Sequence, residues 1–274
     1  MKTALSMTTD FAADRGDPSP HLRRIADAGF THVHWCHQWN TDFLYDASEI
    51  QQIAAWLAEY GLQLLDLHGS AGVEKAWNSP HEYARLAGVE LVRNRIDMTA
   101  ALGGDVVILH TGEPAAGGGT LFWRSLRRSL DALQPSAASR GVRLAIENGP
   151  WPVIRALLAE YPPDYVGLCY DSGHGNIGQA GLDELDAVKE RLLSVHLHDN
   201  DGRTDQHKPP FTGTVDWTRL AGVLAGSGYR KCLSFESTMR QAGISDEAQF
   251  LAQVLAAGER LTAMLRARGH GGLR

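Results

Sequence analysis

Short apolar segments of strand-forming residues alternate with longer segments of helical periodicity along the whole chain. This alternation is typical of repeated β-α units built around a parallel sheet. The chain contains eight such units, and the predicted strands span residues 3–7, 31–35, 62–67, 105–110, 142–147, 165–170, 193–198 and 231–236. Glycines suited to ending a helix precede five of these strands, at Gly29, Gly61, Gly103, Gly141 and Gly228.

Eight strands that alternate with eight helices, without a linker between them, predict a single (β/α)8 TIM barrel over residues 1–274. A doubly wound open sheet is the alternative, because closure of a barrel leaves no mark in the sequence. A chain of 274 residues suits one domain of this kind. We expect the last few residues, which follow an arginine-rich helix, to form a frayed tail.

Polar residues that can bind a metal ion stand at the ends of six predicted strands. They end the strand or directly follow it, and they are His68, His110, Glu147, Asp171, His198 and Glu236. Each alone is more often a structural histidine or a surface carboxylate. Together they point into one barrel mouth, where several carboxylates would repel one another unless a cation compensated. The pattern therefore predicts a divalent-metal site.

The types of these residues indicate which ion is expected, and the alternation along the strands indicates which residues lie beneath them. Mixed imidazole and carboxylate ligands suit transition metals better than Ca, and the expected cofactor is a divalent ion of Mn, Co, Mg or Zn. Because side chains alternate along a strand, a second inward layer lies below the first. Small or apolar residues dominate this layer, with two polar exceptions, and its members are Asp66, Ile108, Ala145, Cys169, His196 and Ser234.

Loops after the strands hold further candidates. The DSGH segment places His174 three residues after Asp171, and a D-x-H spacing places Asp205 and His207 on the loop after the seventh strand. These three side chains are candidates to orient a substrate, bind a second metal ion or cap helices. His34 and Trp35, at the end of the second strand, are candidates to line the pocket. Asp216, just before an apolar helical segment, is interpreted as a helix N-cap.

Composition and charge restrict the class of protein. A net charge of −6 disfavours a protein that grips phosphate backbones, so a small-molecule substrate is favoured over nucleic acid. No segment approaches the roughly 20 apolar residues needed to cross a bilayer, and the start of the chain does not have the apolar run of a signal peptide. We therefore expect a cytoplasmic protein. Exposed barrel faces often pair, so a homo-oligomer is an open expectation.

The three cysteines carry no recognisable chemistry. None of Cys36, Cys169 and Cys232 forms a CxxC pair, and we interpret them as reduced, buried thiols.

Four segments together resemble the xylose-isomerase-like TIM-barrel superfamily: AIEN around Glu147, CYDSGH around Asp171, the long segment 195–217, and SFES around Glu236. The likeness spans nearly all of the chain. This superfamily contains sugar isomerases and epimerases, inosose dehydratases and the endonuclease IV class of abasic-site nucleases.

The resemblance implies roles for individual residues. In the sugar epimerases, one divalent ion is held by the residues that match Glu147, Asp171, His198 and Glu236. The residues that match Glu147 and Glu236 also transfer protons, and the one that matches His174 contacts substrate. In endonuclease IV, three zinc ions are held with the help of residues that match His68, His110, His174, Asp205 and His207. All nine positions are occupied in this chain.

The function implied is a metal-dependent isomerase or epimerase of a sugar or related polyhydroxy carbonyl compound. The alternatives are a multi-zinc phosphoesterase that acts on abasic DNA and an inosose-dehydratase-like lyase. Loops 36–40 and 69–78 do not combine the basic and aromatic residues expected for penetrating an abasic duplex, which disfavours the nuclease. A barrel that only binds a ligand is disfavoured because no ligand position is missing. The residues expected to contact substrate are His174, His207, His110, His68, His34 and Trp35.

Overall fold

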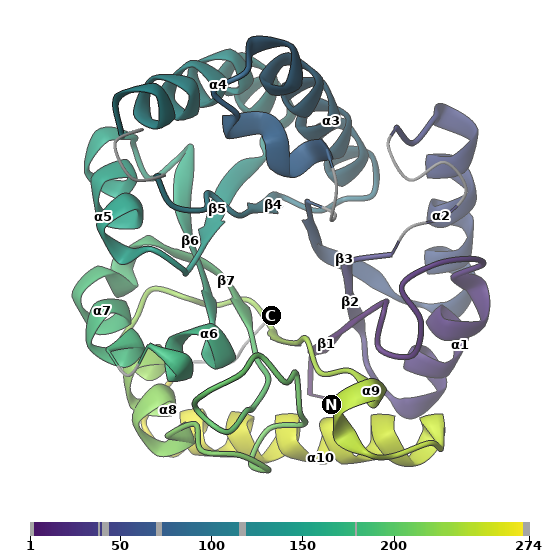
Figure 1. The fold of residues 1–274 in the computed structure, drawn as a ribbon. Coiled ribbons are helices and arrows are strands. Elements are labelled where there is room, and N and C mark those ends of the chain that lie inside the picture. The colour runs from purple at the N-terminus through teal and green to yellow at the C-terminus, as the bar shows by residue number, and fades with distance from the viewer. Residues whose placement is uncertain are drawn as a thin grey trace.

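The computed structural model describes residues 3–37, 39, 44–69, 73–114, 119–178 and 180–270. Eight parallel strands form one sheet in the order β7-β6-β5-β4-β3-β2-β1-β8. Their bounds are β1 Leu5–Thr8, β2 His32–Trp35, β3 Gln63–His68, β4 Val106–Leu109, β5 Arg143–Glu147, β6 Val166–Asp171, β7 Leu192–His196 and β8 Leu233–Phe235. The predicted (β/α)8 barrel is confirmed, and Figure 1 shows the strands enclosed by a ring of helices.

The barrel closes through few contacts between β7 and β8. A single parallel bridge joins Leu197 to Phe235, and the Leu197 amide donates to the Ser234 carbonyl at 2.9 Å. The last strand is also shorter than predicted, because only Leu233–Phe235 pairs with β1. The open-sheet alternative is therefore excluded by these bonds, which connect residues far apart in the sequence.

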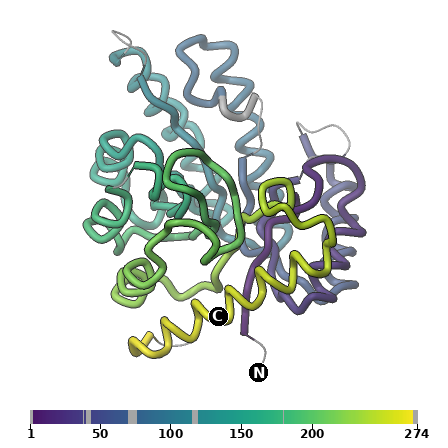
Figure 2. The backbone as a smooth tube through the Cα atoms, turned by 60° about the horizontal axis from the view of Figure 1, so that its bottom comes forward, coloured from purple at the N-terminus to yellow at the C-terminus, as the bar shows by residue number. Residues whose placement is uncertain are grey.

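The longer helices cover the outside of the barrel (Figure 1). Within the described residues the helices are α1 Ser19–Ala28, α2 Ala47–Tyr60, α3 Glu82–Ala101, α4 Gly119–Arg140, α5 Trp151–Glu160, α6 Ser172–Ile177, α7 Gly181–Val188, α8 Trp217–Ala225, α9 Met239–Ala242 and α10 Glu247–Arg266. Two short ones, α6 and α9, supply residues to the cavity at the mouth of the barrel. Helix α10, yellow in Figure 2, lies against α8 and α1 and completes the ring. Among the described residues, no helix is both long enough and apolar enough to span a membrane.

Local sequence signals set several helix ends. Asp46 and Glu49 form a capping box at the start of α2, and Gly61, with φ of 67°, ends that helix in the left-handed conformation. The predicted N-cap role of Asp216 is confirmed, because its side chain accepts from the Arg219 amide at 2.9 Å. These caps satisfy backbone groups that a helix leaves unpaired at its ends.

The interior of the barrel holds both apolar and polar side chains. A small apolar cluster fills the interior and comprises Val106, Ile108, Ala145, Cys169 and Leu193. The predicted second layer is buried throughout, with Asp66 and His196 both 0% exposed. The second layer is therefore mixed: Ile108, Ala145 and Cys169 belong to the apolar cluster, and Asp66 and His196 are polar residues buried beside them.

Candidate metal centre

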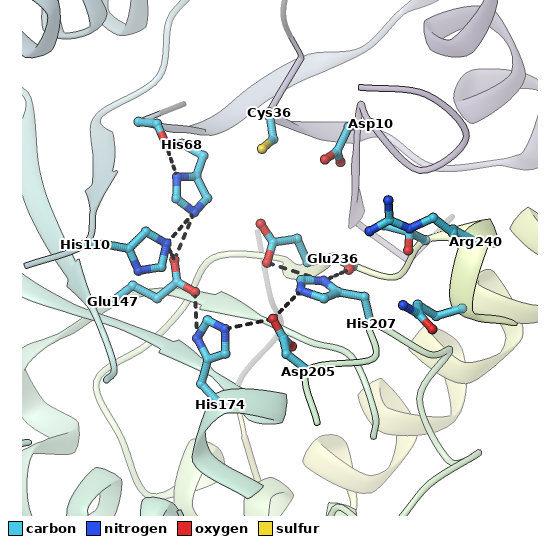
Figure 3. Close-up of a pocket in the computed structure, with 13 residues that line it drawn as sticks. Asp10, Cys36, His68, His110, Glu147, His174, Asp205, His207, Glu236 and Arg240 are labelled. Carbon is cyan, nitrogen blue, oxygen red and sulfur yellow. Dashed lines mark hydrogen bonds and ion pairs between the residues drawn. The ribbon is translucent and has the colours of Figure 1, made fainter. Parts of the chain in front are cut away.

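The carboxyl ends of the strands enclose a cavity of about 430 Å³. Each strand, or the segment that follows it, supplies at least one residue to the wall. Among the described residues, the wall comprises Asp10, Cys36, His68, Gly69, His110, Glu147, His174, Asp205, His207, Glu236, Thr238, Arg240 and Gln241 (Figure 3). Characterised TIM-barrel enzymes have their active sites at this end of the barrel. The cavity is therefore the candidate active site.

Glu147, at the end of β5, lies among imidazoles. Its Oε2 is 3.1 Å from His68 Nε2 and 3.4 Å from His110 Nε2, and these two nitrogens are 3.2 Å apart. Its Oε1 is 3.2 Å from His174 Nδ1. Both carboxylate oxygens are buried, yet neither accepts a hydrogen bond of acceptable geometry. Buried acceptors of this kind require an explanation, and a shared cation supplies one.

Asp205 joins the imidazoles on the opposite side of the cavity. Its Oδ2 is 3.1 Å from His207 Nε2 and 3.4 Å from His174 Nε2, as the dashed lines in Figure 3 mark. Its Oδ1 is 3.7 Å from His198 Nε2. The rings of His198 and His207 stack with centroids 3.9 Å apart. The D-x-H spacing therefore brings both of its side chains into the cavity wall.

Asp171 and His198 lie behind the cavity wall and are both 0% exposed. His198 Nε2 is 3.0 Å from Asp171 Oδ2. The Ser172 hydroxyl donates to the His198 carbonyl at 2.6 Å and so fixes the end of the seventh strand. A Cβ at Gly173 would lie 2.0 Å from His198 Cε1. The DSGH segment therefore packs directly against His198 and fixes the position of its ring.

The loop after β7 is held by Asp199, which is fully buried. Its carboxylate accepts from the Val215 amide at 3.1 Å and from Trp217 Nε1 at 2.8 Å. Its backbone pairs in both directions with Lys208, next to His207. His207 itself has φ of 45°, a left-handed conformation that is costly for a residue with a side chain. These bonds hold His207 in place, and its Nδ1 lies 2.7 Å from the Glu236 carbonyl oxygen.

The charges in the site compensate one another. Burial raises the pKa of Glu147, but the positive charges of His110 and His196 outweigh it and hold that pKa well below its usual value. Burial likewise raises the pKa of Glu236, and His196 outweighs it, so the net shift is again downward. The Asp171 carboxylate raises the pKa of His174 to about 12. Ionised carboxylates in this cavity therefore depend on positive charge close to them.

This donor set fits a divalent cation. Imidazole nitrogens of three histidines lie 3.1–3.4 Å from the carboxylate oxygens of Glu147. Nitrogen and oxygen donors this close together can share one bound ion. The positive charge that keeps the carboxylates ionised is also the charge that an ion brings. Several three-residue groups of this kind occur among the described residues, and one of them is His68, His110 and Glu147.

Short contacts connect the four residues predicted as innermost ligands. His198 contacts Asp171 directly, and a shared histidine connects Glu147 to Asp171 and another connects Glu147 to Glu236. His174 Nδ1 lies 3.2 Å from Glu147 Oε1 and 3.8 Å from Asp171 Oδ1. His196 Nδ1 lies 3.4 Å from Glu147 Oε2 and 3.3 Å from Glu236 Oε2. The further candidates that the sequence singled out for the site also reach the cavity wall: His68, His110, His174, Asp205 and His207.

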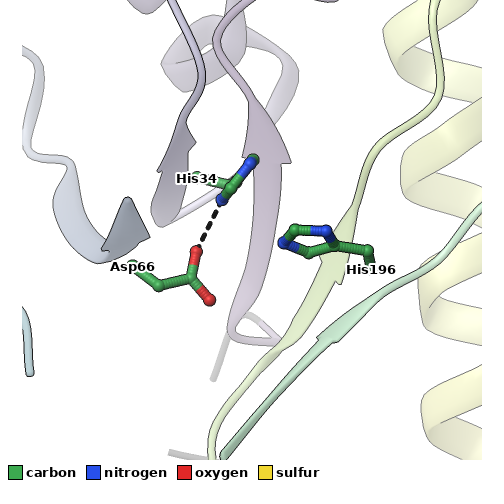
Figure 4. Close-up of side chains that lie close together, drawn as sticks. All are labelled: His34, Asp66 and His196. Atoms are coloured by element: carbon green, nitrogen blue, oxygen red, sulfur yellow. Dashed lines mark hydrogen bonds and ion pairs between the residues drawn. The ribbon is translucent and has the colours of Figure 1, made fainter. Parts of the chain in front are cut away.

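Two residues expected to line the pocket lie elsewhere. His34 is 0% exposed and does not line the cavity; its Nδ1 lies 2.7 Å from Asp66 Oδ1, and Figure 4 shows the two side chains facing each other. Trp35 is 2% exposed and packs toward Tyr45, whose hydroxyl lies 3.4 Å from the Trp35 Nε1. The reason is the alternation along β2, which makes Cys36 the next inward residue toward the mouth. Cys36 lines the cavity in their place.

Several residues of the wall were not found from the sequence. Asp10 and Cys36 follow the first two strands, and the rule applied to the other six strands would have found them if loops had been included. Thr238, Arg240 and Gln241 belong to the segment after β8. They carry no metal-ligand pattern, and only the fold brings them to the cavity.

A sequence profile of the family described as xylose isomerase-like TIM barrel matches residues 22–254. The chain belongs to this family. An uncharacterised protein of Sinorhizobium fredii, y4fM, is 32% identical over 264 residues, which cover 84% of each chain. The family membership confirms the resemblance drawn from the four sequence segments.

Solved structures of sugar epimerases share the fold at low sequence identity. An L-ribulose 3-epimerase superposes with a TM-score of 0.78 at 19% identity, covering 98% of this chain and 97% of the other. A D-psicose 3-epimerase from Clostridium cellulolyticum H10 gives 0.77 at 14% identity, covering 96% and 99%. These similarities show that the proteins share a barrel fold. The reaction of this chain must be inferred from the residues of its own site.

Proposed function

We propose that this protein is a divalent-metal-dependent isomerase or epimerase that acts on a sugar or a related polyhydroxy carbonyl compound. The observation that carries the proposal is the pairing of Glu147 and Glu236 in one cavity wall. One nitrogen, His196 Nδ1, lies within 3.4 Å of a carboxylate oxygen of each. Two adjacent carboxylates are the groups that proton transfer to and from carbon requires. The structural neighbours named as sugar epimerases support the same reaction class.

Glu147, Asp171, His198 and Glu236 would hold the ion. A divalent ion bound there supplies a Lewis acid that polarises a substrate carbonyl and acidifies the adjacent C–H. Whether the native ion is Mn, Co, Mg or Zn is decided by metal analysis, because the mixed donor set accommodates each.

The two glutamates would divide the proton transfer. One carboxylate removes the proton from the carbon next to the carbonyl and becomes a carboxylic acid. The other glutamate relays a proton from a neighbouring imidazole, His174 beside Glu147 or His207 beside Glu236, to the opposite face of that carbon and gives the epimer. Delivery of the proton to the neighbouring carbon gives the isomer instead. In both cases the substrate and product have the same composition, and the proton lost by the imidazole equals the proton gained by the first glutamate.

The histidines of the wall would bind the substrate. His174 and His207 flank Asp205 at the cavity, and both rings are about a quarter exposed. His68 and His110 face the same space from the β3 and β4 ends. Imidazole nitrogens donate to or accept from hydroxyl groups, so these positions suit a polyhydroxylated ligand.

A second candidate function is multi-metal phosphoester hydrolysis, as in the endonuclease IV class. It is favoured by two neighbouring groups of donors, which the contact between His174 and Glu147 connects: His68, His110 and Glu147 in one, and His174, Asp205 and His207 in the other. Clustered ions activate water and clamp a phosphate. The net charge of −6 disfavours nucleic acid as the substrate. Loss of water from an inosose in the same site would make the protein a dehydratase.

Metal counting tests the proposal first. The protein is purified without chelators, and the ions per chain are counted by mass spectrometry. One Mn, Co or Mg ion per chain supports the isomerase or epimerase, whereas two or three Zn ions support the phosphoesterase. The metal-loaded enzyme is then incubated with ketoses and inososes in D2O. Deuterium at the carbon next to the carbonyl is expected in the wild type, and its absence over the whole panel would contradict proton transfer.

A further inference from the structure

The segment after β8 supplies the cavity with side chains that the proposed proton transfer does not use. They are Thr238, Arg240 and Gln241, and they lie in the short helix α9 or directly before it. Figure 3 shows Arg240 across the cavity from His110, with its guanidinium group directed into the cavity. Among the described residues, the wall contains no other arginine and no lysine. One permanent positive charge therefore faces the bound substrate.

The guanidinium group of Arg240 has no partner within the described part of the chain, where it forms neither an ion pair nor a hydrogen bond. The carboxylates of the same wall have other partners: Glu147, Asp205 and Glu236 contact histidines, and Asp10 accepts from a threonine hydroxyl. A guanidinium group carries five N–H donors and no acceptor. These donors are therefore available to a ligand.

Two neutral donors lie on the same segment. The Thr238 hydroxyl and the Gln241 side-chain amide line the cavity, and neither makes a hydrogen bond to the residues that the structure describes. Hydroxyl, amide and guanidinium groups all donate hydrogen bonds. The segment also brings no carboxylate of its own to the wall. It therefore presents the kind of surface to which an anionic group binds.

Backbone hydrogen bonds hold this segment between two other loops of the barrel mouth. The Thr238 amide donates to the His207 carbonyl at 2.9 Å, and the Met239 amide donates to the Phe11 carbonyl at 2.8 Å. The segment directly follows Glu236. Its donors are therefore held at a fixed place relative to one of the two glutamates that would transfer protons.

We propose that Arg240, assisted by Thr238 and Gln241, binds an anionic group of the substrate, so that the enzyme acts on a sugar phosphate or a sugar acid. The planar fork of a guanidinium group matches two oxygens of a phosphate or a carboxylate. The cavity of about 430 Å³ has the size of a small-molecule site. This inference rests on the proposed function, because it names the class of substrate on which Glu147 and Glu236 would act.

The bound ion and Arg240 would act on different parts of the substrate. The ion polarises a carbonyl group, and the two glutamates act at the carbon next to it. Arg240 would hold a charged group that takes no part in the proton transfer. Binding a remote group fixes the orientation of the reacting carbons, and it favours the charged sugar over a neutral one.

Inorganic phosphate tests the site with a probe that has no sugar part to fit. It is titrated by calorimetry into Mn²⁺-loaded wild type and two variants, after excess ion has been removed. Arg240→Met keeps an apolar side chain of similar length without the charge, and we expect phosphate affinity to fall about 10- to 100-fold. Arg240→Lys keeps the charge but loses the fork, so an intermediate affinity is expected.

Arg124→Met is the matched control. Arg124, on α4, is exposed, has no partner among the described residues and lies outside the cavity wall. Its phosphate affinity is expected to equal that of the wild type. Circular dichroism and thermal unfolding report whether each variant is folded.

Three ketoses then identify the anionic group. D-fructose, D-fructose 6-phosphate and D-fructuronate differ only at the terminal carbon, which carries a hydroxyl, a phosphate or a carboxylate. If wild type binds the phosphate more tightly than Arg240→Met does, the substrate is a sugar phosphate. The same difference for D-fructuronate assigns a sugar acid. The affinity for D-fructose is expected to be equal in the two proteins.

The outcomes separate this inference from the proposed function. A folded Arg240→Met variant that binds phosphate and both charged ketoses as tightly as wild type overturns the inference, because the ion or the histidines then hold the anion. Wild type that binds none of these anions also overturns it. Absence of deuterium exchange over the whole panel of ketoses and inososes contradicts the proposed function, whereas the calorimetric comparison still decides whether Arg240 holds an anion.

Discussion

Gly173 packs against the His198 ring so closely that a Cβ at this glycine would lie 2.0 Å from His198 Cε1. The first turn of α6 thereby sets the position of a histidine that follows β7 by two residues. The Ser172 hydroxyl binds the His198 backbone and the Asp171 carboxylate lies 3.0 Å from the ring nitrogen Nε2, so both the backbone and the ring of His198 are held in place. The contact links the packing of the loop to the arrangement of the proposed ligands.

Gly173→Ala is therefore expected to displace His198. We expect Mn²⁺ affinity to fall about 10-fold or more, because a ligand leaves its position. The free energy of unfolding is expected to fall by about 1–3 kcal/mol from overpacking. Gly178→Ala is the control, since nothing lies within 4 Å of a Cβ at that position and its φ of −81° suits alanine. Equal metal affinity in the two variants would show that His198 is not a ligand.

Glu236→Gln is expected to abolish turnover while the barrel stays folded. The amide neither accepts nor returns a proton, and general acid–base groups typically contribute about 10²- to 10⁴-fold to the rate. Metal affinity is expected to weaken as well. Deuterium incorporation from D2O, together with the melting temperature, measures both effects. Glu259→Gln, on the exposed face of α10, is expected to retain full activity; retained activity in Glu236→Gln would remove this residue from the mechanism.

Removal of metal is expected to destabilise the protein. An ion that binds only the folded state stabilises it by about 2.7 kcal/mol at 100 times its Kd. For a chain of this size, that free energy corresponds to a melting temperature several degrees higher. Dialysis against a chelator should lower Tm, and Mn²⁺, Co²⁺ or Zn²⁺ should restore it. A melting temperature that no divalent ion changes would count against a resident cofactor.

Gly88→Ala is expected to destabilise the helix layer and disturb the cavity from a distance. A Cβ at Gly88 would lie 2.3 Å from the Trp77 backbone nitrogen, so α3 must move away from the turn that carries Trp77. Trp77 Nε1 donates to the His110 carbonyl at 3.1 Å, which connects this turn to the cavity. We expect the free energy of unfolding to fall by about 1–3 kcal/mol. Chemical denaturation measures the change, and a stability equal to wild type would show that the helix relaxes freely.

Glu82 is expected to give a pH-dependent contribution to stability. Its carboxylate binds Arg85 in two hydrogen bonds of 2.8 Å, and this pairing lowers the pKa of Glu82 to about 2. A carboxyl group with a lowered folded-state pKa stabilises above its unfolded value near 4.5 and loses that effect as pH falls toward 2. The Tm difference between wild type and Glu82→Gln should therefore be larger at pH 7 than at pH 3. A difference that is independent of pH would contradict the ion pair.

The packing of the strands in the barrel determines the position of some residues that no local sequence pattern identifies. His34 was expected at the pocket, but alternation along β2 and a shift in its register between Val33 and His34 put it one layer deeper, against Asp66. Arg240 reached the cavity wall from a segment without a ligand pattern. Sequence periodicity gives the face on which a side chain lies, whereas its depth depends on the strand register, which neighbouring strands set.

The sequence by itself determined the eight β-α units and the edge at which the chemistry gathers. Alternation and periodicity record local burial, and parallel strands in one barrel necessarily end at the same side, which brings Glu147, Asp171 and Glu236 together. Only the tertiary structure decided that the sheet closes, which oxygen faces which imidazole, and that His196 stands between two glutamates. Those contacts join residues dozens of positions apart, and they follow from strand register and packing in three dimensions, which no local sequence pattern encodes.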